Sequence, residues 1–265
     1  MRRTVIACAA LCLLGPAIWA GVVLETEVEV PDDPELTGSE TFYAQGEATR
    51  TDSLTAAGKK MSVIFREQTM YFVDHGKKVC QTIDKKGVDQ LSEQLDEIMK
   101  QMESLPPEQR AMMEKMMKGK MPGAQEPPDW RIEPGGTDQV GDYPCTLYTF
   151  YSDEDKVKEV CAAEESTVGD LAEAMDAVHA LSRFAEGLMK VAQNLPFADM
   201  MEGVYKAVPE IEGFPVRTKW FDSDGKITQE RTLKSITRRD IEADLFTVPK
   251  GYKVKSLEKE MKKAR

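Results

Sequence analysis

The feature that most constrains the fold is the segment of residues 213–253, which has the pattern of two strands and a turn. Phe214–Phe221 and Lys226–Ile236 are amphipathic, and the four residues between them end in Asp-Gly, which supplies the positive φ that a tight hairpin needs. The segment closes with a hydrophobic anchor, Phe246, and a Pro-Lys-Gly turn. No catalytic group stands out in it. It therefore predicts an antiparallel sheet as the base of the structure.

Further strands are predicted in the N-terminal part of the chain. Gly21–Val30 alternates between valine or leucine on one face and glutamate on the other, so we expect a strand that is exposed to water on one side. The sheet is expected to continue as an antiparallel meander through four short segments: Phe42–Arg50, Met61–Phe65, Met70–Val73 and Lys78–Ile83.

Two helical blocks follow these strands in the sequence. In the first, Gly87–Lys118, apolar residues recur at spacings of three and four until a pair of prolines interrupts the helix. In the second, Thr167–Ala207, Thr167 and Asp170 stand in the order of a capping box at the start of a long amphipathic helix. Each block therefore has an apolar stripe that must be buried against another part of the fold.

These elements together predict an α+β fold. Alternating strands need one covered face, and the helices carry the apolar stripes that can cover it. We therefore expect a single, strongly curved antiparallel sheet with both helical blocks packed on its concave face. Residues 119–136, rich in Pro and Gly, are expected to form a linker or exposed loop ending near Trp130. The domain is expected to span residues 21–253, before a basic tail at residues 254–265.

The beginning of the chain predicts secretion. Positive charge at Arg2 and Arg3 precedes the apolar run Val5–Ala20, which is typical of a signal peptide at residues 1–20; an uncleaved anchor is the alternative. Removing this leader lowers the 35 basic residues to 33 against 46 acidic residues, a net charge of −13. Such an acidic protein is a poor partner for nucleic acid or anionic lipid surfaces. We expect the protein in the periplasm of a Gram-negative bacterium. Peripheral contact with a membrane is compatible with this location.

The end of the chain carries a family resemblance. The sequence Leu245-Phe246-Thr247-Val248-Pro249-Lys250-Gly251-Tyr252, after a strand hairpin, resembles the terminal segment of a family of secreted bacterial proteins, domain of unknown function 4412, with a LolA-like fold. LolA-like carriers are curved half-barrels with helices over the concave face, and they hold lipid or lipoprotein acyl chains. The resemblance implies that fold and that class of ligand. It names no particular ligand.

Three cysteines remain once the leader is removed. Cys145 and Cys161 flank a hairpin, and a turn of three or five residues around Glu154 would set them opposite each other, within reach of a disulfide. The family resemblance points to the same bridge, and two buried thiols are the alternative. Cys80, inside a predicted strand, is expected to be an unpaired core residue rather than a nucleophile.

The sequence offers few groups for catalysis. His75 is expected in a hairpin turn and His179 within the long helix, and neither has a spaced partner that would make it a metal ligand. The turn that begins at Asp222 resembles the start of a calcium loop, but Leu233 stands where the loop needs Glu. Gly-rich phosphate loops, nucleophile elbows and Cys-x-x-Cys pairs are missing from the sequence. We therefore expect a non-enzymatic protein without cofactor or metal.

Methionine is concentrated in the two helical blocks, above all in residues 112–121. Three interpretations compete: ordinary core packing, a soft lid over an apolar cavity, and a site for cuprous copper. The copper interpretation is weakened because no His or Cys lies near these methionines. We favour a lid, because proline and glycine residues isolate this short helix at both ends.

We therefore expect an envelope protein that binds a lipid, an acyl chain or another hydrophobic ligand between sheet and helices. The alternative is a chaperone-like or envelope-stress protein that presents its methionines to an unfolded client or a lipoprotein, because Leu105–Arg110 resembles a motif of Spy-type periplasmic chaperones. Strand parity and the methionine-rich helix select twelve candidate lining residues. They are Leu24, Val28, Val63, Phe65, Met70, Phe72, Met113, Met117, Leu147, Val216, Trp220 and Leu233.

Overall fold

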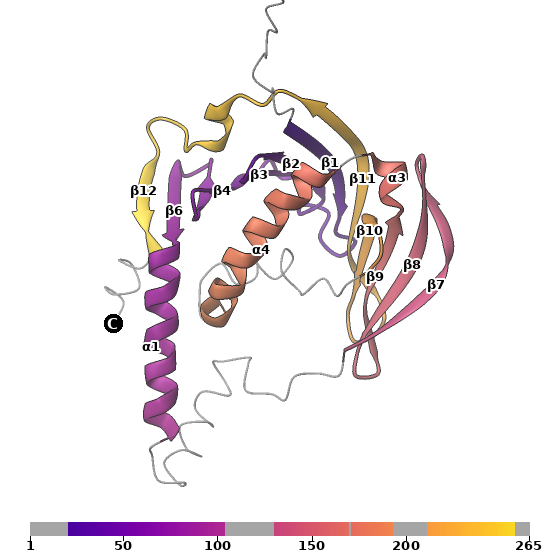
Figure 1. Ribbon diagram of the computed structural model, residues 1–265. Coiled ribbons are helices and arrows are strands. Elements are labelled where there is room, and N and C mark those ends of the chain that lie inside the picture. The colour runs from indigo at the N-terminus through magenta and orange to yellow at the C-terminus, as the bar shows by residue number, and fades with distance from the viewer. Residues whose placement is uncertain (1–20, 104–129, 170, 193–210, 258–265) are drawn as a thin grey trace, which may run out of the picture.

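The computed structural model describes residues 21–103, 130–169, 171–192 and 211–257, and within these ranges twelve strands form one strongly curved sheet (Figure 1). The strand order across the sheet is β12-β6-β5-β4-β3-β2-β1-β11-β10-β9-β8-β7. The signal peptide expected at residues 1–20 lies outside the described residues. The strands are β1 Gly21–Glu29, β2 Gly38–Gln45, β3 Ala48–Thr55, β4 Lys60–Arg66, β5 Thr69–Asp74, β6 Val79–Asp84, β7 Trp130–Val140, β8 Tyr143–Ser152, β9 Asp155–Ala163, β10 Phe214–Phe221, β11 Ile227–Arg239 and β12 Lys253–Ser256.

The predicted hairpin is confirmed and lies at the middle of the sheet. Its turn has Gly225 at φ 76°, and the side-chain Oδ1 of Asp222 accepts hydrogen bonds from the backbone N–H groups of Asp224 (3.0 Å) and Lys226 (2.9 Å). Strand β11 then pairs antiparallel with β1. The hairpin therefore joins the N-terminal meander, β1–β6, to the strands β7–β9.

The first strand is buried on both of its faces near its start. Val22, with no exposed surface, packs in a cluster with Ala174 and Ala177 of a helix, whereas Val23 packs with Ile241 and Phe246 from the end of the chain. The prediction of a strand exposed to water on one side is therefore wrong for this part of β1. Alternation could not show it, because the segment that covers Val23 is more than two hundred residues away in the sequence.

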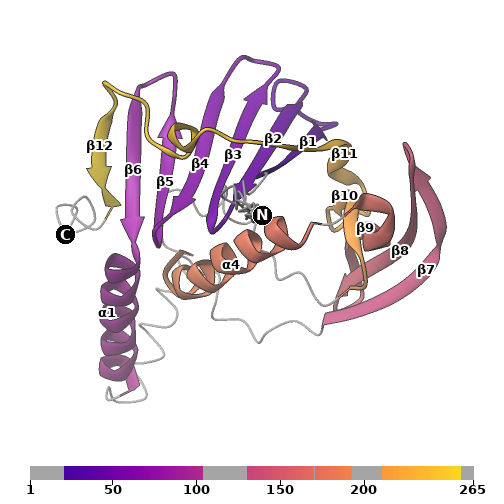
Figure 2. The ribbon, with the colours of Figure 1, turned by 45° about the horizontal axis from the view of Figure 1, so that its top comes forward.

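Helix α4 (Ala172–Ala192) crosses the hollow of the sheet (Figures 1 and 2), whereas residues 193–207 of the second predicted block lie outside the described residues. Helix α1 (Lys85–Glu103) differs from the expectation: it begins at the end of β6 and extends past the ends of the strands. The cause is local, because α1 follows β6 without a loop and Asp84 accepts a hydrogen bond from the Gly87 N–H (2.8 Å). None of the described helices is both long and apolar enough to cross a membrane.

The predicted start of the second helical block is also wrong. Thr167 lies inside a separate short helix, α3 (Glu165–Val168), and its hydroxyl donates a hydrogen bond to the Glu164 carbonyl (2.7 Å). Gly169, with φ 82° and ψ 176°, ends this helix after four residues. A glycine adopts this backbone conformation readily, so the capping pattern does not lead into one continuous helix.

Two strand predictions need correction. Phe42–Arg50 is not one strand, because Gly46 (φ 58°) begins a turn that separates β2 from β3. Strand β7 begins inside the segment expected to be a linker, at Trp130, and contains Pro134. It tolerates proline because it is the last strand at one edge of the sheet, and its register with β8 shifts just after this proline.

The end of the chain covers the convex face of the sheet. We call residues 241–252 the C-terminal strap; it includes the 3₁₀ helix η1 (Ala243–Phe246), which contacts β3 and β4. The predicted anchor, Phe246, is buried there with Ile64, Val73 and Cys80. Beyond the strap, β12 pairs in parallel with β6, and Leu257 is 2% exposed. The tail predicted from residue 254 therefore begins inside the fold.

The predicted disulfide between Cys145 and Cys161 is present and joins β8 to β9, with the two Cα atoms 5.4 Å apart. The expected register is wrong, because Cys145 lies opposite Ala163 and Cys161 lies opposite Leu147. The hairpin closes through a two-residue turn and shifts register further along, so the bridge is diagonal. Cys80 is a buried free thiol, as expected, and its burial raises its pKa to about 11.

Candidate ligand-binding site

Two hydrophobic clusters pack between the sheet and its helices, where the sequence predicted a ligand cavity. The first joins strands β4–β6 to α1, α4 and the end of the chain: Phe65, Met70, Phe72, Ile83, Val88, Phe184 and Leu257. The second surrounds the disulfide and the first turns of α4: Val22, Ala44, Val140, Cys145, Cys161, Ala163, Val168, Leu171, Ala174, Ala177, Val216 and Leu233.

Eight of the twelve candidate residues belong to these clusters or pack against them. Val63, Phe65, Met70 and Phe72 lie in the first, and Leu24, Leu147, Val216 and Leu233 lie in the second. Most of them fill the core rather than line a cavity; Met70, for example, has no exposed surface. Strand parity placed these side chains on the face toward the helices, but it could not show which positions other side chains occupy.

The remaining four candidates do not join the clusters. Val28 is buried outside them. Trp220 lies on β10, and the Arg231 guanidinium is 5.4 Å from the centre of its ring. Met113 and Met117 lie outside the described residues, as does the whole predicted lid, so the choice between lid, core and copper site stays open.

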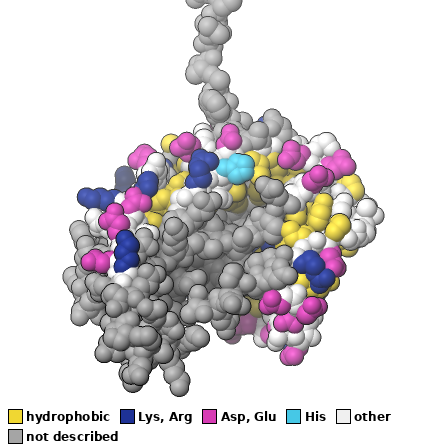
Figure 3. Space-filling view, turned by 60° about the horizontal axis from the view of Figure 1, so that its bottom comes forward, with side chains coloured by type: hydrophobic (Ala, Val, Ile, Leu, Met, Phe, Trp, Pro, Cys, Tyr) yellow, Lys and Arg dark blue, Asp and Glu magenta, His cyan; other side chains and the backbone are white. Residues whose placement is uncertain are grey.

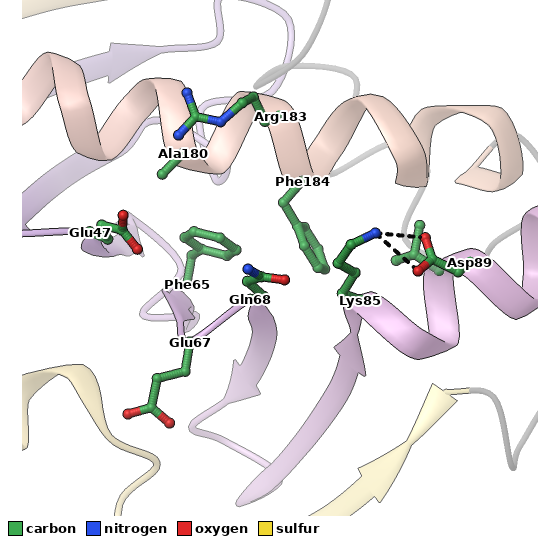
Figure 4. A pocket seen from close by; sticks show the side chains of 10 residues that line it. Glu47, Phe65, Glu67, Gln68, Lys85, Asp89, Ala180, Arg183 and Phe184 are labelled. Carbon is green, nitrogen blue, oxygen red and sulfur yellow. Dashed lines mark hydrogen bonds and ion pairs between the residues drawn. The ribbon is translucent and has the colours of Figure 1, made fainter.

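A pocket of about 240 Å³ opens beside the first cluster, where α4 passes over the start of α1 and two turns of the meander (Figure 4). Phe65 of β4 and Phe184 of α4 form its apolar wall, with ring centroids 5.2 Å apart. Val88 and Ala180 complete the apolar lining. Of the ten candidates that the structure describes, only Phe65 lines this pocket.

Charged side chains form the rim of the pocket. Lys85 and Asp89 come from the first turns of α1 and are paired with each other at 3.0 Å. Glu67, in the turn between β4 and β5, pairs with Arg66 at 2.9 Å. Two further charged residues of the rim are Glu47, in the β2–β3 turn, and Arg183, on α4. In the view of Figure 3, hydrophobic and charged side chains of the described residues lie next to each other on this face of the molecule.

The position of the rim depends on the turns of the meander. The β4–β5 turn places Glu67 (φ 53°) and Gln68 (φ 55°) in the left-handed region, and the Gln68 carbonyl accepts a hydrogen bond from the Lys85 N–H (3.0 Å). This bond ties the turn to the start of α1. The rim residues of the β4–β5 turn and of α1 are therefore joined at the same corner of the fold as the apolar wall.

The convex face holds a partly buried ion pair beneath the strap. Arg50 is 7% exposed, and its Nε donates to the Asp52 carboxylate at 2.7 Å. Its Nη1 donates to the Leu245 carbonyl of the strap at 2.6 Å. Because a buried charge needs such partners, this pair fixes the strap to β3.

His75 extends this network to the end of the strap. The Ser62 hydroxyl donates to Asp52 (2.5 Å) and lies 2.7 Å from Nε2 of His75, whose Nδ1 lies 2.9 Å from the Tyr252 hydroxyl. Burial lowers the pKa of His75, with a smaller effect of the nearby positive charges of Lys60 and Arg50, so its neutral form is favoured. The sequence offered no partner for His75, because Tyr252 is 177 residues away.

This Asp-Ser-His group is not arranged for nucleophilic catalysis. Ser62 has no exposed surface, and its proton is directed to Asp52 rather than to the imidazole. Within the described chain, no group of three or more His, Cys, Asp or Glu side chains is placed to hold a metal ion. The network instead holds the strap against the sheet.

Comparison with known proteins identifies the family. The model of the family "Domain of unknown function (DUF4412)" matches residues 93–252. The chain belongs to the DUF4412 family. This match extends from α1 to the last residue of the strap, so it includes α4 and the central hairpin. Phe65 and the turn that carries Glu67 precede the matched residues.

Solved structures similar to this DUF4412 chain share little sequence with it. An uncharacterized conserved protein from Thermus thermophilus is 10% identical over 90% of this chain and 91% of its own, with a TM-score of 0.46. A Pseudomonas aeruginosa MucA/MucB complex contains a chain that is 8% identical, over 91% of this chain and 59% of that one, with a TM-score of 0.40. A LolA superfamily protein from Nitrosomonas europaea is 8% identical over 88% and 91%, with a TM-score of 0.29. No curated protein sequence matches the chain.

Proposed function

We propose that this DUF4412 protein is a non-enzymatic binding protein of the bacterial cell envelope that holds an acyl chain between its sheet and α4. The observation that carries the proposal is the pocket at Phe65 and Phe184, which combines an apolar wall with a charged rim. An amphiphile needs both surfaces, one for its chain and one for its head group.

The size of the pocket narrows the ligand class. Pockets for drug-sized ligands have volumes of roughly 300–1,000 Å³, whereas this one has about 240 Å³. It therefore suits one linear chain rather than a lipid with several chains. The disulfide supports a location in an oxidising compartment, in agreement with the expected signal peptide.

Two variants of α4 test the site directly. Ala180 lines the pocket, and Ala180→Trp would fill it with an indole ring. His179 is the preceding residue on the same helix and is exposed, so His179→Trp is the matched control. Binding of a fluorescent fatty-acyl probe should weaken about tenfold or more in the first variant and stay within about twofold in the second.

Circular dichroism and thermal unfolding would establish that both variants are folded. Equal probe binding by the two variants would show that acyl chains do not use this pocket. Mass spectrometry of an organic extract from the purified protein would then identify any co-purified lipid. A protein that is free of lipid but suppresses the aggregation of an unfolded client would favour the chaperone-like alternative.

A further inference from the structure

The charges around the pocket are not equally satisfied by the protein. Lys85 and Asp89 neutralise each other, and Glu67 has Arg66 as its partner. Glu47 and Arg183 also line the pocket, yet within the described chain neither has an ion pair or a side-chain hydrogen bond. One anion and one cation are therefore available at the mouth of the pocket.

These two residues come from different elements and lie at one end of the pocket. Glu47 belongs to the turn between β2 and β3, and Arg183 to the middle of α4; both are exposed. In the view of Figure 4, both lie toward the Phe65 end, whereas Lys85 and Asp89 lie beyond Phe184. At one end of the mouth, Lys85 and Asp89 neutralise each other. At the other end, Glu47 and Arg183 are two unpaired charges of opposite sign.

The chemistry of these two groups selects among head groups. A guanidinium binds phosphate oxygens with paired N–H donors, and a carboxylate binds an ammonium group. A head group with only a negative charge would gain the interaction with Arg183 but would be repelled by Glu47. A neutral head group would gain neither interaction.

We propose that Glu47 and Arg183 select a zwitterionic head group, an ammonium joined to a phosphodiester, on a single-chain amphiphile. This inference rests on the proposed function, because it assigns the head group of the ligand whose chain occupies the pocket. Arg183 binds the phosphodiester, and Glu47 binds the ammonium. Both groups are exposed, so each contributes modestly, about three- to fivefold in affinity.

The test compares three ligands with the same acyl chain. Lysophosphatidylethanolamine is zwitterionic, lysophosphatidylglycerol is anionic and monoacylglycerol is neutral. Each would displace the fluorescent fatty-acyl probe from the full-length protein, at concentrations below those at which the ligands form micelles. We expect the zwitterion to bind about three- to fivefold more tightly than the anion, which lacks the interaction with Glu47, and at least about tenfold more tightly than the neutral ligand, which lacks both interactions.

Charge-removing variants assign the preference to the two residues. Glu47→Gln should abolish the preference for the zwitterion over the anion, and Arg183→Gln should reduce its preference over the neutral ligand by about three- to fivefold. Glu67→Gln is the matched control, because Glu67 lines the same pocket but already pairs with Arg66. It should leave the order of affinities unchanged.

The outcomes separate this inference from the proposed function. If the probe binds and all three ligands displace it equally, or the anion displaces it best, the head-group assignment is wrong and the acyl-chain site stands. A preference that Glu67→Gln removes as effectively as Glu47→Gln does would also overturn the assignment. If neither the probe nor any of the ligands binds, the proposed function itself fails.

Discussion

Leu257 provides the sharpest test of how the end of the chain is used. It is 2% exposed and packs in the cluster that contains Phe65, Val88 and Phe184, although the sequence predicts a fraying tail at this position. Leu257→Ala removes buried methyl and methylene groups and leaves a cavity, which costs about 2–5 kcal/mol in well-packed cores. Because Leu257 follows a four-residue edge strand that can shift, we expect the lower part of this range, about 2–3 kcal/mol.

The measurement is urea-induced unfolding followed by tryptophan fluorescence. Val254→Ala is the matched control, because Val254 lies on the same strand but is 56% exposed. Its free energy of unfolding should change by no more than about 0.5 kcal/mol. If the two variants lose equal stability, or neither loses any, Leu257 is not anchored in the cluster and the reasoning fails.

Two further predictions concern the convex network and the disulfide. The pKa of His75 is lowered by burial, so the unfolded chain binds a proton more readily than the folded one; stability should be constant above about pH 6.5 and fall as pH decreases below it. Chemical unfolding between pH 5 and pH 8 measures this slope, and a His75→Gln variant with the same slope would exclude His75 as its source. The double variant Cys145→Ala/Cys161→Ala should lose about 3 kcal/mol of unfolding free energy, because the bridge closes a loop with a sequence separation of 16 residues. Reducing agent should destabilise the wild type but leave this variant unchanged, and equal responses would contradict the prediction.

The sequence predicted elements whose signals are local. The hairpin of β10 and β11 was predicted because alternation and an Asp-Gly turn are both visible within Phe214–Ile236. Strand β7 was missed because Pro134 and its two following glycines argue against a strand, and they are tolerated only at a sheet edge. Edge position depends on the whole topology, which no local pattern contains.

The candidate site was predicted less completely than the fold. Strand parity correctly assigned Phe65 to the face toward the helices. The same rule also selected Met70, which is buried in the core and does not line the pocket. The rest of the pocket arises where α4 meets two turns, so Glu47 becomes a neighbour of Ala180 and Arg183 only through the path of that helix. A helical period identified the apolar stripe of α4 but not the part of the sheet beneath it.

The strap has a consequence for the order in which the protein can fold. The bond from Arg50 to the Leu245 carbonyl spans 195 residues, and β1 pairs with β11 across a similar distance. A chain that emerges from its N-terminus first has β1–β6 available long before β11, β12 and the strap. Until then, β1 and β6 each have one unpaired edge, and the apolar convex surface at Val23 and Ile64 is uncovered. Such long-range closure slows folding and exposes the early intermediate to aggregation, so the nascent meander is the stage at which a holding chaperone would matter most.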